Sequence, residues 1–318
     1  MNKFLARRTV PLLVGAIIFF VCLQYIVRSF QWMEIIQIIK SANLVWLLGA
    51  GALSILIFCL LRTWRWFILL KNLNIRINYI DLHLCNAASM SLTIITPFQS
   101  GEVVKVELLK RSGLIERFSG YSSFITERVI DLLVIVSIAV ISLLINFDLG
   151  INKSTIIYAW VLLLLLLATG IFIIHRVSFK GKLGRFLSHL RQCTRNTSSL
   201  LLVILLTFCA WAMVVIGWQI CLYSISIDLG FQKSIALMSV TTLINILSFV
   251  PGAVGVSEVG ITEVLSRMGL TLASAQAGAF VLRFYSILVI LVGAVHFLLW
   301  KILRNRRTTV ARAETRQK

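Results

Sequence analysis

The sequence predicts an all-α polytopic membrane protein, with about six full spans and two opposed re-entrant helical hairpins that are broken by proline and glycine. Of its 318 residues, 59% are hydrophobic and only 14% are charged, whereas roughly a quarter of the residues in soluble proteins are charged. A soluble domain needs about 50 residues or more, and no stretch of that length is free of apolar segments. We therefore expect a single integral membrane domain over residues 1–318.

Six apolar stretches approach or exceed the length that a membrane span needs, about 20 residues. They lie at residues 11–27, 43–61, 121–145, 155–174, 198–225 and 273–300, and the last is interrupted by Arg283. The first stretch follows three basic residues, as a signal peptide would, but it lacks a clear small-x-small cleavage site and is followed by Arg28. We therefore expect it to be an uncleaved span.

Two further apolar stretches are each broken by a proline and, four residues later, by a glycine, with an acid soon after. Residues 80–96 run into Pro97 to Glu102, and residues 234–249 run into Pro251 to Glu258. Proline and glycine interrupt helices, and non-helical backbone at membrane depth persists only where protein or a water-filled cavity covers it. We expect re-entrant hairpins over residues 80–118 and 234–270. The alternative is a pair of coincidental kinks in packed helices.

The basic residues are distributed unevenly between the two sides of the predicted membrane. With the N-terminus inside, residues 1–10, 62–119, 175–196 and 301–318 carry 24 Lys and Arg residues, against four in the outside loops. Because positive loops stay in the cytoplasm, we expect a protein of the cytoplasmic membrane whose N-terminus and basic C-terminal tail both face the cytoplasm. The same count requires one hairpin to enter from each side, which is typical of inverted repeats in transporters.

The overall composition excludes several kinds of partner. A net charge of +19 would indicate nucleic acid on a soluble chain, but here no aromatic and basic residues interleave as a single-strand groove requires. Anionic lipid is the natural partner of such a basic surface. The six cysteines form no C-x-x-C pair, and no two of the four histidines stand at ligand spacing, so we expect no metal and no cofactor. The oligomeric state stays open.

Charged residues inside apolar spans are costly, so each needs a partner or a function. Glu127, Arg128 and Asp131 are spaced to share one helical face, and their negative surplus could attract Arg283. With Glu258 of the second break included, three acids face two bases, Arg128 and Arg283. We expect the acid that remains to be protonated or to pair with a substrate cation. The alternative is a salt-bridge network that only holds helices together.

Glu258 follows the second break directly and has no basic residue three or four positions away. By contrast, Glu263 has Arg267 four residues further on. Glu258 must therefore find its partner elsewhere or hold a proton. The helix expected from about Gly255 turns its unpaired N–H groups toward the break, and together with Arg283 they could bind a phosphate. The alternative is an acid that only stabilises the helix dipole.

The first break fits a capped helix start, with Thr96 as the cap, Pro97 as the first residue and Gln99 reaching back. The following residues, 102–111, have the pattern of an amphipathic interfacial helix. Upstream, residues 62–66 combine two arginines with two tryptophans and resemble an interfacial belt. We expect no catalytic role for that belt.

At these residues the chain resembles the flippase-like membrane proteins related to the transmembrane region of lysylphosphatidylglycerol synthase. The resemblance covers most of the chain and depends on Pro97, Gly101, Glu102, Lys105, Glu127, Arg128, Asp131, Pro251, Gly252, Gly255, Glu258 and Arg283. It implies a bacterial or archaeal membrane protein that moves or presents a lipid, with these polar positions and Gln99 lining the path. Phe98 and Gln99 stand where the family often has a basic residue.

The resemblance implies a lipid transporter or flippase for an anionic, aminoacylated or polyprenyl-linked headgroup. An alternative is a non-transporting membrane partner of a lipid-modifying or glycosyl-transferring enzyme. A third is an intramembrane transferase with Glu258 or Asp131 as general base. The sequence contains no G-x-S-x-G, H-E-x-x-H or Asp-x-Asp motif, and the soluble transferase domain fused in some relatives is absent. We therefore expect that the chain is not an enzyme and does not make the lipid itself.

Overall fold

The computed structural model describes residues 2–146, 152–176 and 180–316, and every regular element in these ranges is helical. The α-helices are α1 (Asn2–Ser29), α2 (Trp32–Lys40), α3 (Gly51–Asn72), α4 (Tyr79–Ile95), α5 (Val103–Arg111), α6 (Arg117–Asn146), α7 (Lys153–Arg176), α8 (Gly181–Arg195), α9 (Thr197–Tyr223), α10 (Gly230–Leu247), α11 (Val256–Arg267) and α12 (Leu272–Arg316). A π-helical turn, η1 (Val45–Ala50), leads into α3, and two 3₁₀ turns, η2 (Pro97–Glu102) and η3 (Pro251–Ala253), mark the breaks. The predicted all-α class is confirmed.

Four of the described helical segments are long and apolar enough to cross a membrane. They are Val45–Asn72, Arg117–Ile145, Thr197–Tyr223 and Leu272–Arg304, and they coincide with four of the six expected spans. The expected span at 11–27 falls in α1, which bends by 83° into α2, so the two helices form a fifth span only if they cross as a bent pair. The expected span at 155–174 falls in α7, of which Lys153–Leu166 is an apolar helical segment among the described residues. The chain is therefore a multi-pass membrane protein, and the count of six is not confirmed.

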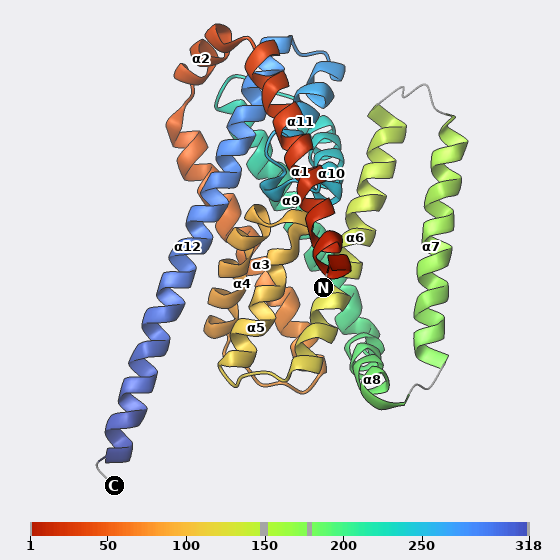
Figure 1. Ribbon diagram of the computed structural model, residues 1–318, viewed down its shortest axis with the longest axis vertical. Helices are drawn as coiled ribbons and strands as arrows, with labels where there is room; N and C mark the ends of the chain where they lie inside the picture. Colours follow the sequence, from red (N-terminus) through yellow and green to blue (C-terminus); the bar gives the residue numbers. More distant parts are fainter. Residues whose placement is uncertain (1, 147–151, 177–179, 317–318) are drawn as a thin grey trace.

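Contacts between distant segments define two ends of the helix bundle. At one end, the backbone N–H of Asn43 donates a hydrogen bond of 2.8 Å to the carbonyl oxygen of Ser224. At the other end, Arg304 of α12 donates to the carbonyl oxygen of Arg111 at 3.2 Å. Figure 1 shows α2 at the first end, and α5, α8 and the C-terminus at the second. We call these the α2 end and the α8 end.

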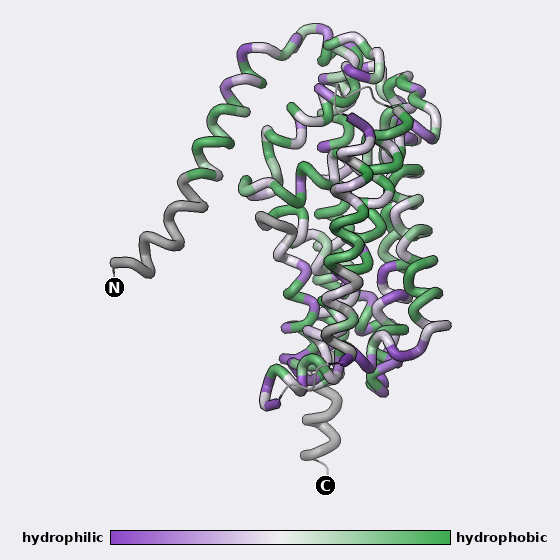
Figure 2. Tube along the Cα trace, turned by 90° about the vertical axis from the view of Figure 1, so that its right-hand side faces the viewer, coloured by the Kyte–Doolittle hydropathy of each residue, from purple (hydrophilic) through white to green (hydrophobic). Residues whose placement is uncertain are grey.

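Hydrophobic residues fill the length between the two ends, as a membrane protein requires. Figure 2 shows hydrophilic residues gathered near the two ends of the bundle and hydrophobic residues along the helices between them. Many large apolar side chains on the outer surface are exposed, among them Ile17, Leu165, Leu205 and Leu291. Burial in lipid would remove this apolar surface from water.

The two broken hairpins enter the bundle from opposite ends. Helices α4 and α5 join at η2 and have their outer termini at the α8 end, whereas α10 and α11 join near η3 and have theirs at the α2 end (Figure 1). Lys233 near the start of α10 donates to the carbonyl oxygen of Met268, just after α11, at 3.2 Å. With 9 and 12 residues, α5 and α11 are only about 14 and 18 Å long. Neither can cross a hydrocarbon core of about 30 Å.

Glycines allow the broken backbone to approach its neighbours closely. Gly252 in η3 has a φ of 66°, and a Cβ added to it would lie 3.3 Å from the carbonyl oxygen of Ile94 in α4. A Cβ added to Gly101 in η2 would lie 2.3 Å from the carbonyl carbon of Leu92. The two breaks, which belong to opposite hairpins, therefore lie against each other. An added side chain would collide with α4 at Gly101, and at Gly252 the positive φ favours glycine.

Candidate functional site

Seven charged side chains form one cluster between α3, η2, α5 and α6. They are Arg62 and Arg65 of α3, Glu102 of η2, Lys105 of α5, and Glu127, Arg128 and Asp131 of α6. All of these residues except Arg128 are buried, and 27% of the Arg128 side chain is exposed. We call this group the charge cluster.

Glu127 lies at the centre of the charge cluster and is completely buried. One of its carboxylate oxygens, Oε2, accepts from the Lys105 ammonium at 2.5 Å, and the other, Oε1, accepts from Arg65. The Arg62 guanidinium is 3.4 Å from Oε1. A carboxylate with three cationic neighbours is satisfied by charge-assisted hydrogen bonds on both oxygens, which is how a protein compensates the cost of burying a charge.

The two other acids of the charge cluster link α6 to α3 and η2. Asp131 pairs with Arg65 and, within its own helix, with Arg128. Glu102 pairs with Arg62 and, at 2.7 Å, with Arg128. Arg128 therefore bridges the first break to α6, and the break is fixed in place by ion pairs rather than by apolar packing alone.

The charge cluster is cationic, which corrects the negative surplus expected from the sequence. Four cations and three anions leave a formal net charge of +1. The expectation omitted one acid, Glu102, and three bases, Lys105 and the two arginines of the supposed interfacial belt. Trp64 of that segment is indeed 49% exposed, but Arg62 and Arg65 are buried on another face of α3. Their spacing of three residues within an apolar helix, which places them on one face, was the signal that could have identified them.

Arg283 of α12 lies at the second break and contacts no residue of the charge cluster among the described residues, so its expected attraction to the acids of α6 is wrong. It pairs with Glu258 and donates to the carbonyl oxygens of Gly252 at 3.0 Å and of Ala253 at 3.3 Å. Glu258 also accepts from the backbone N–H of Gly255 at 2.7 Å, which makes it a helix cap. Glu258 thus finds the distant partner that its local sequence lacks, and Arg283 holds the η3 backbone in its broken conformation.

At the first break Thr96 takes the expected cap position, but the turn that follows is not the expected α-helix. Pro97 occupies the first position of the turn, and the hydroxyl oxygen of Thr96 accepts from the backbone N–H of Gly101 at 2.7 Å. The turn is a 3₁₀ helix, however, and the α-helix begins only at Val103. The side chain of Gln99 lies outside the described residues, so its expected role stays a prediction.

Three adjoining cavities lie between the two groups of charges. A cavity of about 350 Å³ is lined by Arg128 and Trp211, and one of about 160 Å³ by Arg62, Trp211 and Asn245. A third, of about 90 Å³, is lined by Arg283 and again by Asn245. Neighbouring cavities share lining residues, so the three lie next to one another between the charge cluster and the second break, and each is lined by one arginine. We call this row of cavities the polar route, after its three guanidinium groups.

Some polar atoms along this route are unpaired. The Nε atoms of Arg62 and Arg128 and the side-chain oxygen of Asn245 are buried and have no hydrogen-bond partner among the described residues. Buried polar atoms are nearly always hydrogen-bonded in proteins. These atoms therefore have capacity for a polar ligand or for water.

Comparison with known proteins gives one family. The family model for the lysylphosphatidylglycerol synthase transmembrane region matches residues 11–293, a range that includes the charge cluster and both breaks. No curated protein sequence matches this chain. The chain belongs to the lysylphosphatidylglycerol synthase transmembrane region family.

Proposed function

We propose that this member of the lysylphosphatidylglycerol synthase transmembrane region family transports a lipid with an anionic headgroup across the cytoplasmic membrane. Family membership indicates a membrane protein that handles lipid. One observation carries the finer proposal: Arg128 and Arg62, two cations of a buried charge cluster with a formal charge of +1, line cavities next to the one that Arg283 lines.

The sign of the charge favours a headgroup that contains phosphate. The route presents three guanidinium groups, whereas the acids near it already accept from at least one cation each. In a medium of low dielectric constant an incompletely neutralised cation attracts an anion strongly. A guanidinium group also presents a planar fork of donors that matches phosphate oxygens. An anionic headgroup is therefore favoured over the cation that the sequence count suggested.

The arrangement of the hairpins supports movement of the headgroup rather than simple binding. In this proposal α4–α5 and α10–α11 are re-entrant, with one open to each side of the membrane, and their breaks meet where the route narrows. Separation of the breaks at one end would expose Arg128 and Arg62, and separation at the other would expose Arg283. Alternating access by two opposed units around a central site is a common arrangement in transporters with inverted repeats.

The proposed orientation follows the basic residues. The loops at 73–78 and 112–116, helix α8 and the C-terminal tail gather at the α8 end (Figure 1), and the segments to which they belong carry most of the Lys and Arg residues. We therefore propose that the α8 end and both termini of the chain face the cytoplasm. A headgroup from the inner leaflet would meet Arg128 and Arg62 before Arg283.

The experiment that tests the proposal uses the purified chain in liposomes without any partner protein or group donor. Phosphatidylglycerol with a fluorescent acyl chain is added to both leaflets, and dithionite then destroys the fluorophores that reach the outer leaflet. We expect loss of the inner-leaflet signal to be faster than in protein-free liposomes. An unchanged rate with folded protein would contradict transport and favour a non-transporting partner. Conversion of the lipid when a donor is added would favour a transferase.

A further inference from the structure

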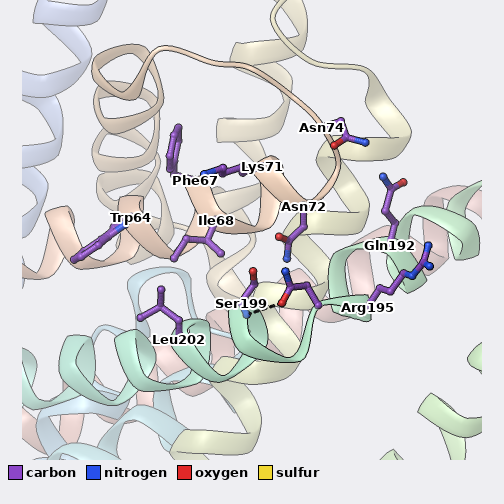
Figure 3. Close-up of a pocket in the computed structure, with 11 residues that line it drawn as sticks. Trp64, Phe67, Ile68, Lys71, Asn72, Asn74, Gln192, Arg195, Ser199 and Leu202 are labelled. Carbon is purple, nitrogen blue, oxygen red and sulfur yellow. Dashed lines mark hydrogen bonds between the residues drawn. The ribbon is translucent and has the colours of Figure 1, made fainter.

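We propose that a groove at the α8 end binds an anionic phospholipid of the adjacent leaflet as a resident lipid, at a site separate from the transport route. The groove has a volume of about 780 Å³ and lies where α3 ends, α8 ends and α9 begins (Figure 3). None of its lining residues belongs to the charge cluster or to either break. The proposal goes beyond transport, since the lipid bound here is not the one that is moved.

Hydrogen bonds hold the walls of the groove in place. The Asn72 side chain, at the end of α3, donates to the carbonyl oxygen of Cys193 in α8 at 3.1 Å. Asn196, between α8 and α9, accepts from the backbone N–H of Ser199 at 3.1 Å and caps α9. Figure 3 draws this cap as a dashed line beside Asn72. The groove therefore lies between connected helix ends.

The lining of the groove changes from apolar to polar along its length. Figure 3 shows Trp64 and Leu202 at one side of the groove, and Gln192 and Arg195 at the other. Trp64 lies eight residues before Asn72 on α3, about 12 Å nearer the middle of the span. Its ring is half-exposed, as an aromatic residue at a membrane interface typically is. A phospholipid has the same gradient, with acyl chains toward the middle and a phosphate at the surface.

The positive charges that line the groove select an anionic lipid. Lys71 and Arg195 are exposed, and neither side chain has a hydrogen-bond or ion-pair partner among the described residues. The residues that line the groove include no Asp or Glu. Arg195 lies beside Gln192, where the two side chains can bind the phosphate oxygens of one headgroup, and Lys71, which lies nearer Phe67, adds a second positive charge to the groove (Figure 3). Free phosphate would leave the apolar half of the groove unused, so the geometry points to a lipid.

The test measures how phosphatidylglycerol shifts the thermal unfolding midpoint of the full chain in mild detergent. The variant Lys71→Gln/Arg195→Gln removes both cations. A basic side chain beside a lipid surface strengthens binding about fivefold, so the pair should weaken the apparent affinity about 25-fold. The matched control, Arg76→Gln/Lys182→Gln, removes two exposed cations from the same end but outside the groove. It should change the affinity less than about threefold.

Two further comparisons test whether the whole lipid is needed and whether the loss of response comes from the lost charge. Phosphatidylcholine and inorganic phosphate should each shift the midpoint less than phosphatidylglycerol does. The charge-retaining variant Lys71→Arg/Arg195→Lys should keep the response of the wild type. The proposal is overturned if the groove variant keeps its full response, if the control variant loses as much, or if inorganic phosphate reproduces the whole shift. Lipid translocation is not the readout, so failure here leaves the proposed transport untouched.

Discussion

Lys105 and Glu127 provide a quantitative test of how the charge cluster stabilises the fold. Both side chains are completely buried, and their charged atoms are 2.5 Å apart. Lys105→Met removes the ammonium but keeps an unbranched side chain that can pack against Trp66, whose ring centre is 4.5 Å from the ammonium. Glu127→Gln removes the carboxylate charge with little change in shape. The two substitutions therefore alter charge and leave packing nearly intact.

The expected magnitudes follow from what each variant leaves unpaired. Lys105→Met lowers the formal charge of the cluster from +1 to zero, and Glu127 keeps its contacts with Arg65 and Arg62. Glu127→Gln raises the charge to +2 and leaves four cations against two acids. Removal of one partner of a buried ion pair costs about 3–5 kcal/mol. We expect Lys105→Met at the low end of that range and Glu127→Gln at the high end.

The double variant restores the formal charge of +1, so it should cost less than the sum of the two single variants. We expect a coupling free energy of about 2–3 kcal/mol from denaturant unfolding in micelles. The control cycle uses Glu263→Gln and Arg267→Met, whose side chains are 60% and 58% exposed. This pair should couple by less than about 0.5 kcal/mol. A buried coupling no larger than the exposed one, or a larger loss for Lys105→Met than for Glu127→Gln, would refute the reasoning.

Three other predictions concern the breaks and the orientation. Gly101→Ala should lower the free energy of unfolding by about 1–3 kcal/mol, because the added Cβ would collide with the backbone of α4. The control Gly49→Ala, at a position with open space around it, should stay within about 0.5 kcal/mol of the wild type. Equal unfolding midpoints for the two variants would contradict the close approach at Gly101. Arg283→Ala should lower the free energy of unfolding by about 3–5 kcal/mol and slow lipid translocation. Arg283→Lys should lose less stability because it keeps the charge. Identical losses in stability would show that the charge is irrelevant. A membrane-impermeant maleimide added to intact cells should label Lys233→Cys and miss Lys182→Cys; labelling of the second would reverse the topology.

The sequence was sufficient where local rules decide the structure. Pro97 and Pro251 lack a backbone N–H donor, and the glycines four residues after each relax the backbone. Both residue types break helices, so both breaks could be located within a residue or two. Span positions followed from apolar length, and four of the six expected spans coincide with helices that qualify. Where helices were short or bent, as in α1 with α2, the count could not be settled from composition.

The sequence was insufficient where the partner of a charge comes from another helix. Arg62 and Arg65 lie next to Trp64, which is exposed, so the segment resembled an interfacial belt. Their true partners are acids more than 35 residues further along the chain. The same holds for Glu258, whose base lies 25 residues away. Tertiary pairing therefore decided the sign of the net charge of the cluster, on which the proposed preference for an anionic headgroup depends.

We propose that the guanidinium groups along the polar route bind an anionic headgroup during its transport. The most direct measurement compares translocation of acyl-labelled phosphatidylglycerol and phosphatidylcholine in liposomes, for the wild type, Arg128→Gln and the exposed control Arg267→Gln. We predict that the wild type and Arg267→Gln move phosphatidylglycerol faster than phosphatidylcholine. Arg128→Gln should lose most of that preference, because it removes a partly exposed cation that lines the largest cavity of the route. Equal rates for the two lipids in the wild type, or an unchanged preference in a folded Arg128→Gln protein, would contradict the account.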